Sequence, residues 1–199
     1  MTYRLKRPLD IAGALTLGFV TLPIQLAVAG SIYLEGLINP KYKRPIVYKA
    51  QRSSKNGSSF KMYKFSSMIK KADEELDNLL LQYGHVNNIQ DDPRVTPIGR
   101  ILRKFSLDEL PQFVNVLKGD MSLVGSRPRS LQETIDLITK GFIEVVKTNP
   151  GMTSLACVNG RRDLNLEQMA EYDSTYEPSI KGDLSILWKT LTHAWYRGK

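Results

Sequence analysis

The chain has 199 residues, which is enough for one sizeable domain but not comfortably for two. Apolar residues make up 42% and charged residues 24%, so the composition is that of a folded protein rather than a disordered one. The formal net charge of +8 indicates an anionic partner, such as a nucleic acid, an acidic lipid or a phosphorylated substrate. The single cysteine, Cys157, excludes an internal disulfide framework, and His85 and His193 are too far apart for a zinc motif.

Residues 11–34 form an apolar segment that carries no charge and is long enough to cross a bilayer. Pro23 lies near its middle, where a proline removes a helical hydrogen bond and favours a kink. The basic residues that flank the segment are Arg4, Lys6, Arg7, Lys41, Lys43 and Arg44. Because basic residues favour the cytoplasmic side of a membrane, a helix that enters, bends at Pro23 and returns accommodates both flanks. The alternatives are a plain transmembrane helix with a tolerated proline and a buried core helix of a soluble protein.

Two short segments after the apolar one have the alternating pattern of β-strands. They are residues 46–50 and 60–65, which carry β-branched or aromatic residues at alternate positions. Asn56-Gly57 lies between them and is a strong turn signal. The pattern therefore predicts a hairpin with a longer loop.

Apolar periodicity and end signals predict three further helices. Their expected bounds are Ser66 or Ser67 to about Tyr83, 106–108 to 118–120, and roughly 130–148. Pro111 is tolerated only in a first helical turn, which is why the second helix should begin near 106–108. Pro150-Gly151 ends this part of the chain, and an irregular stretch is expected after it.

A last helix is predicted near the end of the chain, where Leu184, Leu187, Trp188, Leu191 and Trp195 share one face. Tryptophans at headgroup depth are typical of a helix that lies in a membrane interface. The alternative is a tryptophan-anchored core helix. The apolar N-terminal segment favours the interfacial interpretation.

Two adjacent carboxylates, Asp108 and Glu109, are the first candidates for chemistry. In the structural interpretation, Ser106 and Glu109 form a capping box at a helix start, where the dipole favours acidic residues. In the functional interpretation, a carboxylate attacks phosphorus and forms an acyl phosphate. The nearby arginines are Arg100, Arg103, Arg127 and Arg129. They can hold phosphates bidentately, with Mg²⁺ offsetting the charge repulsion, although any one of them can instead be a solvated surface charge.

Two longer stretches carry a resemblance to a known family. They read RKFSLDELPQ at 103–112 and NVLKGDMSLVG at 115–125, and Lys64-Phe65 and Asn159-Gly160-Arg161 add to them. With these motifs, and with a likeness that runs nearly end to end, the chain resembles the small monotopic phosphoglycosyl transferases, the bacterial sugar transferase family.

The resemblance, taken with the pattern of elements, implies an α+β, mainly helical fold. It implies an N-terminal re-entrant membrane helix broken near Pro23, a small β-hairpin, and amphipathic interfacial helices around the active site. Residues 1–40 would be the membrane helix. Residues 41–199 would be a catalytic domain on the cytoplasmic face of the bacterial inner membrane.

The resemblance also implies a reaction. Asp108 would be the nucleophile that attacks the β-phosphate of a UDP-sugar, and Glu109 would complete the catalytic and Mg²⁺-binding pair. UMP would leave, and polyprenyl (undecaprenyl) phosphate would then take the sugar phosphate from the aspartate. The residues expected to bind substrate are Lys64, Arg103, Arg127 and Arg161. The expected partners are the UDP-sugar, the polyprenyl phosphate and membrane lipid, with self-association left open.

Three departures from the family pattern spare the carboxylate pair. Ser126 replaces the usual Pro before Arg-Pro, residues 154–157 read SLAC instead of GWAQ, and Ser66 replaces a commonly basic residue. The first can loosen the turn that aims Arg127, and the second can alter selectivity for sugar or nucleotide. The competing hypothesis is a non-catalytic membrane-surface protein that binds acidic lipid or a partner. Nucleic-acid binding is disfavoured, because no basic stripe is interleaved with stacking aromatics.

Overall fold

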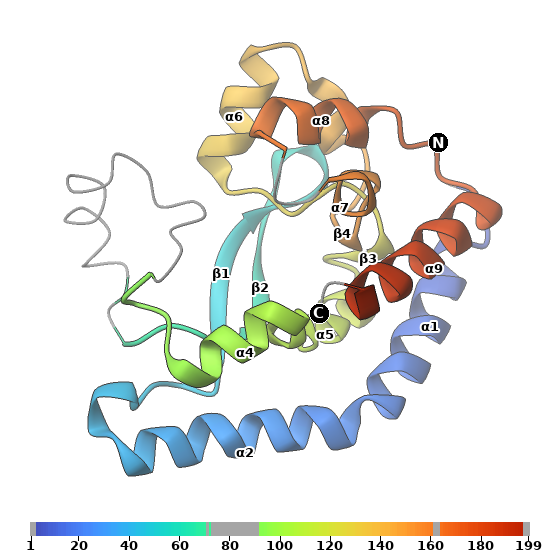
Figure 1. Ribbon diagram of the computed structural model, residues 1–199. Helices are drawn as coiled ribbons and strands as arrows, with labels where there is room; N and C mark the ends of the chain where they lie inside the picture. Colours follow the sequence, from blue (N-terminus) through green and yellow to red (C-terminus); the bar gives the residue numbers. More distant parts are fainter. Residues whose placement is uncertain (1–2, 71, 73–91, 161–163, 197–199) are drawn as a thin grey trace.

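The computed structural model describes residues 3–70, 72, 92–160 and 164–196, the last four of these as backbone only. Within this part of the chain the fold is α+β and mainly helical, with two small two-stranded sheets. In Figure 1 an angled helical arm runs along the lower edge, a hairpin rises from it, and further helices surround the hairpin. The mainly helical class and the small hairpin are therefore confirmed.

The arm consists of α1 (Lys6–Val20) and α2 (Leu22–Ile38), which are bent by 59° where they meet. Pro23 lies in the first turn of α2, where a proline costs no helical hydrogen bond, so the break falls at Thr21 rather than at Pro23. Thr21 Oγ1 donates a hydrogen bond of 2.7 Å to the Leu17 carbonyl there. No single described helix is long and apolar enough to cross a membrane, whereas α1 and α2 together have the required length and composition.

The expected hairpin consists of β1 (Val47–Ser53) and β2 (Ser59–Phe65), paired antiparallel. Both strands extend further toward the turn than the sequence pattern predicted, because β1 runs to Ser53 instead of residue 50 and β2 begins at Ser59 instead of residue 60. The turn uses left-handed conformations, with φ of 58° at Asn56 and 75° at Gly57. A single turn, η1 (Pro40–Tyr42), lies between the arm and β1. The open end of the hairpin lies against the arm, where apolar side chains of β2 and α2 pack together.

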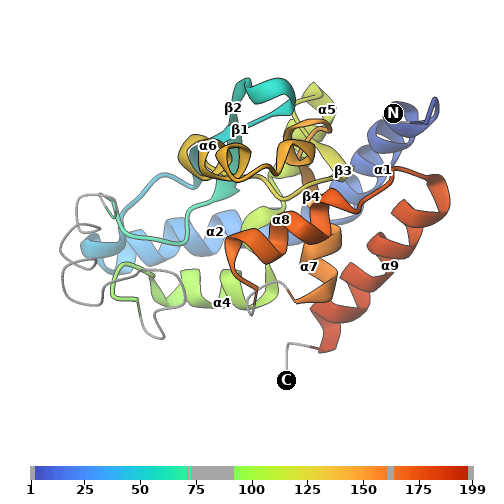
Figure 2. The same cartoon turned by 90° about the horizontal axis from the view of Figure 1, so that it is seen from above.

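A helical segment follows the hairpin; its first helix lies beside α2, as Figure 2 shows from above, and its last helix packs on α1. The elements of this segment are α4 (Pro97–Phe105), η3 (Leu107–Glu109) and α5 (Gln112–Lys118). Thr96 caps α4 by accepting a hydrogen bond of 2.9 Å from the Gly99 amide. The single helix expected from 106–108 onward is two elements, because Pro111 precedes the first residue of α5 instead of lying inside its first turn. Its end is as predicted, since Gly119 follows α5 with a φ of 92°.

The segment after β2 differs from the expected helix start. Neither Ser66 nor Ser67 caps a helix, and Met68 forms an isolated antiparallel bridge with Val95. The Ser67 carbonyl accepts a hydrogen bond of 3.1 Å from the Thr96 amide, so this segment is held against the start of α4. The rest of the helix expected up to about Tyr83 lies outside the described residues.

The second half of the chain contains a parallel sheet and further helices. These elements are β3 (Ser122–Val124), α6 (Leu131–Thr139), η4 (Ile143–Val146), β4 (Gly151–Thr153), α7 (Leu155–Asn159), α8 (Leu166–Ser174) and α9 (Ile180–Tyr196). The helix expected over 130–148 ends at Thr139, because the chain turns at Gly141 with a φ of 92°. The expectation of an irregular stretch after Pro150-Gly151 is wrong. Strands and helices this short carry too little periodicity to be seen in the sequence.

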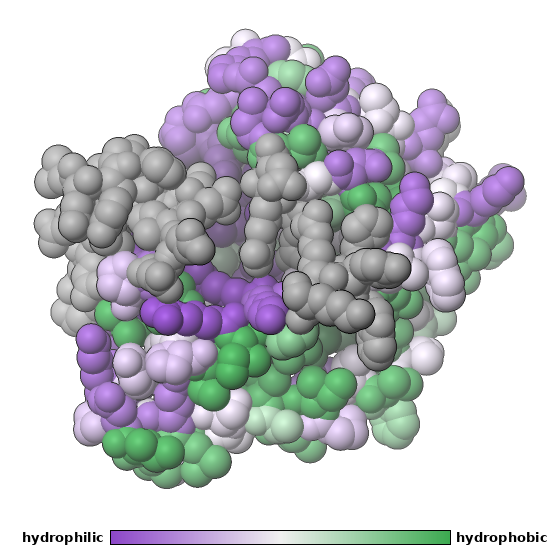
Figure 3. Space-filling model, viewed as in Figure 1, coloured by the Kyte–Doolittle hydropathy of each residue, from purple (hydrophilic) through white to green (hydrophobic). Residues whose placement is uncertain are grey.

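The outer surface of the arm and of α9 is rich in exposed apolar side chains. In Figure 3 apolar residues gather on the lower part of the face, where Figure 1 places α1 and α2, and hydrophilic residues dominate the upper end around α6 and α8. On α9, Leu184, Trp188 and Leu191 are 62%, 69% and 62% exposed, whereas Leu187 packs on the core. The apolar face expected on the last helix therefore exists at these three positions, with Leu187 turned inward. The side chain of Trp195 lies outside the described part of the chain.

Candidate active site

The two adjacent carboxylates lie on η3, the single turn between α4 and α5. Ser106, the residue before this turn, has a left-handed conformation with a φ of 57°, and its side chain makes no capping hydrogen bond. The structural interpretation of Ser106 and Glu109 as a capping box is therefore wrong. The left-handed residue ends α4 and begins a new turn, on which Asp108 is 8% exposed and Glu109 is half-buried.

Lys64 reaches both carboxylates from the end of β2. Its Nζ lies 3.4 Å from Glu109 Oε1 and 3.9 Å from Asp108 Oδ2. Burial raises the pKa of Asp108 above its usual range; the charge of Lys64 opposes this rise, the neighbouring Glu109 adds to it, and Arg103 opposes it. One shielded carboxyl group and one partly exposed carboxylate thus share a single ammonium group.

Arg103 lies on the last turn of α4, close before η3 in the chain. Its Nε donates a hydrogen bond of 2.9 Å to Ser67 Oγ, in the segment that follows β2. Its charge opposes the rise that burial causes in the pKa of Asp108. The structure therefore brings Lys64, Arg103 and the carboxylate pair together from β2, α4 and η3, as the sequence led us to expect.

Arg127 lies in the loop between β3 and α6, which is fixed by other contacts. Its backbone amide donates to Asp173 Oδ2 at 2.8 Å, and Arg129 Nη2 donates to the same oxygen at 2.7 Å. Ser126 Oγ donates to the Val145 carbonyl at 3.0 Å. The serine that replaces the usual proline therefore adds a hydrogen bond that a proline side chain has no means of forming.

One of the expected substrate-binding residues, Arg127, is not joined to the carboxylates. Within the described part of the chain, no hydrogen bond or ion pair links Arg127 to Asp108 or Glu109, and Arg127 is exposed. Arg161 lies outside the described residues, so its expected contact stays a prediction. The assembled site is therefore the group formed by Lys64, Arg103, Asp108 and Glu109.

The donor atoms at η3 suit a cation that is shared with a substrate. In the described ranges, no group of three or more His, Cys, Asp and Glu side chains could hold a metal ion. Mg²⁺ commonly binds through one or two carboxylates and completes its shell with water and substrate phosphates. Asp108 and Glu109 supply two such carboxylates on one turn. They fit Mg²⁺ held jointly with a phosphorylated ligand.

Comparison with known proteins decides the family to which this arrangement belongs. A family model described as bacterial sugar transferase matches residues 1–197. The chain belongs to the bacterial sugar transferase family. The resemblance inferred from its motifs is thereby confirmed.

Curated relatives of this sugar transferase include longer and shorter proteins. The undecaprenyl-phosphate galactose phosphotransferase of Salmonella typhimurium is 34% identical over 195 residues, covering 94% of this chain and 39% of the relative. The UDP-glucose:undecaprenyl-phosphate glucose-1-phosphate transferase of Escherichia coli is 34% identical over 196 residues, with the same shares of 94% and 39%. The uncharacterized sugar transferase EpsL of Bacillus subtilis is 36% identical over 189 residues, covering 94% of this chain and 85% of the relative. The chain thus spans 39% of the first two relatives and most of the third.

Asn115 holds the site of this sugar transferase together and was not singled out in the sequence. It is fully buried on α5, where its Oδ1 accepts from the Tyr63 amide at 2.9 Å and its Nδ2 donates to the Lys61 carbonyl at 2.8 Å. These bonds fix β2 against α5, and so fix the position of Lys64. The available signal was an amide residue among the apolar positions of a helix, where a buried polar group needs partners.

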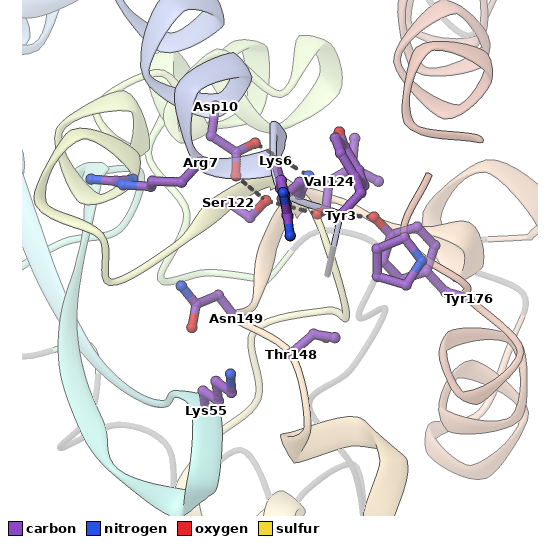
Figure 4. A pocket seen from close by; sticks show the side chains of 12 residues that line it. Tyr3, Lys6, Arg7, Asp10, Lys55, Ser122, Val124, Thr148, Asn149 and Tyr176 are labelled. Atoms are coloured by element: carbon purple, nitrogen blue, oxygen red, sulfur yellow. Dashed lines mark hydrogen bonds and ion pairs between the residues drawn. The ribbon is translucent and has the colours of Figure 1, made fainter. Parts of the chain in front are cut away.

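A cavity of about 270 Å³ lies elsewhere in the sugar transferase, near the start of α1 and β3, and none of the four residues of the assembled site lines it. Figure 4 shows Lys6, Arg7 and Asp10 among its lining side chains. Lys6 Nζ lies 2.6 Å from Asp183 Oδ2 and 3.2 Å from Asp10 Oδ1, while Arg7 donates to the Val116 carbonyl. These cations already have internal partners that join α1 to α5 and α9.

Proposed function

We propose that this chain transfers a sugar 1-phosphate from a UDP-sugar to a polyprenyl phosphate such as undecaprenyl phosphate, with release of UMP. The observation that carries the proposal is the buried Asp108 beside Glu109, with Lys64 bridging the two carboxylates. The names of the Salmonella and Escherichia coli relatives state undecaprenyl phosphate, and the latter states UDP-glucose. They support the two substrate classes.

In the proposed first step, a carboxylate oxygen of Asp108 attacks the β-phosphorus of the UDP-sugar. A bond forms between this oxygen and the phosphorus. The bond from the same phosphorus to the oxygen that bridges the two phosphates breaks, and UMP leaves with that oxygen. Asp108 then carries the sugar phosphate as an acyl phosphate.

In the proposed second step, a phosphate oxygen of polyprenyl phosphate attacks the phosphorus of this intermediate. The bond between phosphorus and the Asp108 oxygen breaks, which restores the free carboxylate. The product is a polyprenyl diphosphate sugar. One nucleophile thus serves a water-soluble donor and a lipid acceptor in turn.

The other residues of the site offset charge and hold phosphates. Lys64 neutralises part of the negative charge of Asp108 and Glu109, which otherwise repels an anionic donor. Mg²⁺ bound by Asp108 and Glu109 would further neutralise the substrate phosphates. Arg103, Arg127 and Arg161 would bind the phosphates or the nucleotide.

The membrane is the second part of the proposal. The arm, within residues 1–40, would be re-entrant, with both ends on the cytoplasmic face of the bacterial inner membrane and residues 41–199 forming the catalytic domain. The exposed apolar side chains of the arm and of α9 support this placement. Leu107 and Leu110 on either side of the carboxylates pack on an apolar cluster that includes Val28 and Ile32 of α2. This packing would bring the carboxylates close to the lipid acceptor.

Turnover in a defined lipid system tests the proposal. Purified protein in nanodiscs is incubated with Mg²⁺, polyprenyl phosphate and a panel of UDP-sugars, and released nucleotide is measured. UMP release that requires one of the sugars supports the transfer. Release of UDP instead would indicate a different glycosyl transfer, and release of neither nucleotide would favour a non-catalytic membrane-surface protein.

A further inference from the structure

One guanidinium group joins the arm to β2 and α4, the elements that carry Lys64 and Arg103 of the assembled site. Arg44, between α2 and β1, has a side chain that is 1% exposed, and its Nη2 lies 2.7 Å from Glu35 Oε2 on α2. Arg44 Nε donates to the Ser66 carbonyl at 3.1 Å, directly after β2. Arg44 Nη2 also donates to Thr96 Oγ1 at 2.9 Å, at the cap of α4. Arg44 therefore links α2, β2 and α4.

Glu35 supplies a second link between the same elements. It is the one charged residue of α2, and its side chain is 9% exposed. Its Oε1 accepts a hydrogen bond of 2.9 Å from the Ile98 amide, which is one of the amides left without a helical partner in the first turn of α4. A carboxylate at that end of a helix is also favoured by the helix dipole. The single charge of α2 is thus used to hold α4.

The contacts between α4 and the end of β2 leave little room for independent movement. A side chain at Gly99 would place its Cβ 1.9 Å from the Ser67 carbonyl oxygen, so the start of α4 lies directly on this segment. Ser66 is two positions after Lys64, and α4 leads through Ser106 into η3. A shift of the end of α2 is therefore passed to Lys64 through β2 and to Asp108 through α4.

We propose that Glu35 and Arg44 are positioning residues, which couple the seating of α2 in lipid to the spacing between Lys64 and the two carboxylates. This inference rests on the proposed function. Neither residue contacts the carboxylates, so both act through β2 and α4. Loss of either one lowers the rate of the chemical steps and leaves the affinity for the UDP-sugar nearly unchanged.

Kinetics of full-length variants in nanodiscs test the inference. The variants are Glu35→Gln, Arg44→Met and Arg44→Lys, each normalised to folded protein. Glu35→Gln and Arg44→Met are expected to lower kcat by about tenfold or more, with the donor KM within about twofold, since small displacements in an active site have large effects on rate. Arg44→Lys should fall between wild type and Arg44→Met. The double variant Glu35→Gln/Arg44→Met should be no slower than Arg44→Met alone, because the two residues act as one unit.

A matched control separates positioning from stability. Asp10→Asn breaks a buried ion pair with Lys6, in which Lys6 Nζ and Asp10 Oδ1 are 3.2 Å apart and the side chains are 10% and 7% exposed. This pair involves no residue of α2 and none of the four residues of the assembled site. The variant should lower the Tm while leaving kcat per folded protein within about twofold. If Glu35→Gln and Arg44→Met behave in the same way, they are structural residues and the inference is overturned.

Bilayer thickness supplies a readout that a structural role would not change. Wild-type kcat should differ between nanodiscs of short-chain and long-chain phosphatidylcholine, and this difference should disappear in Arg44→Met. A wild-type kcat that is equal in both lipids would overturn the coupling. A wild-type protein that releases no UMP would instead overturn the proposed function, so the two failures are distinguishable.

Discussion

Lys6 and Asp183 form a buried ion pair of 2.6 Å across 177 positions of the chain, which joins the first turn of α1 to the first turn of α9. Tyr3 and Tyr176 donate hydrogen bonds of 2.9 Å and 2.5 Å to the same carboxylate. Burial and these bonds to Asp183 raise the pKa values of both phenols, which therefore stay protonated as donors. The two ends of the described chain are thus held by one carboxylate.

Asp183→Asn should destabilise the fold strongly, because it leaves Lys6 in a buried position with Asp10 as its remaining partner. We expect a loss of about 2 kcal/mol or more in the free energy of unfolding, measured by thermal unfolding in detergent. The control is Glu167→Gln, which removes an ion pair with Lys140 whose side chains are 52% and 55% exposed. That change should leave the Tm nearly unchanged, because solvent screens an exposed ion pair. Equal effects of the two variants would show that the Lys6–Asp183 pair is not an anchor.

Asp108→Asn should abolish turnover and yet stabilise the protein at neutral pH. Burial raises the pKa of Asp108, so ionising it costs the folded state more than the unfolded state, and stability is lost as the pH rises through the folded pKa. The amide removes this cost. The Tm gain of Asp108→Asn, measured without divalent cations, should therefore be present at neutral pH and vanish below the ordinary aspartate pKa of about 4. A variant that is less stable than wild type at neutral pH would contradict this assignment of the burial cost.

Local signals in the sequence predicted a large part of this structure. Asn56-Gly57 marked the hairpin turn, because left-handed residues are needed there, and the apolar segment marked the arm. The motif around Asp108 and Glu109 led to the carboxylate site, and Lys64 and Arg103 are placed beside it.

The parts that were missed depend on contacts between distant segments. β3 and β4 are three residues each, and their parallel pairing brings Ser122 opposite Gly151. Nothing local distinguishes such strands from loop. Ser106 has the sequence of a helix N-cap, but it ends α4 in a left-handed conformation and its side chain caps nothing. The role of Glu35 also could not be predicted locally, because its partner on α4, the Ile98 amide, lies 63 positions later in the chain.

Gly99→Ala should disrupt the joint between α4 and the segment after β2. The added Cβ would lie 1.9 Å from the Ser67 carbonyl oxygen, which is backbone and has no rotamer with which to move away. We expect destabilisation of about 3 kcal/mol or more, together with loss of turnover by the protein that still folds. Gly30→Ala is the control, because its Cβ would meet nothing within 4 Å. Thermal unfolding and UMP release measure both effects, and a tolerated Gly99→Ala would refute the close approach.

Trp188 on the apolar face of α9 should lie at the boundary between the headgroups and the acyl chains of the bilayer. It is 69% exposed between Leu184 and Leu191, on a face that no described element covers. In a Trp195→Phe background, Trp188 is the remaining tryptophan, and brominated acyl chains should quench its fluorescence in nanodiscs. Full fluorescence in brominated lipid would show that α9 faces water.

Asp108 is proposed to accept the sugar phosphate on its carboxylate, and detection of the phosphorylated aspartate tests this assignment most sharply. Wild-type protein is mixed with Mg²⁺ and its UDP-sugar in the absence of polyprenyl phosphate, quenched, and digested for mass spectrometry. We expect a mass increase of one sugar phosphate on the peptide that contains Asp108 and removal of that mass by added polyprenyl phosphate. Asp108→Asn should show no such mass. Turnover of the donor with the label on another residue, or undiminished turnover by Asp108→Asn, would contradict this assignment.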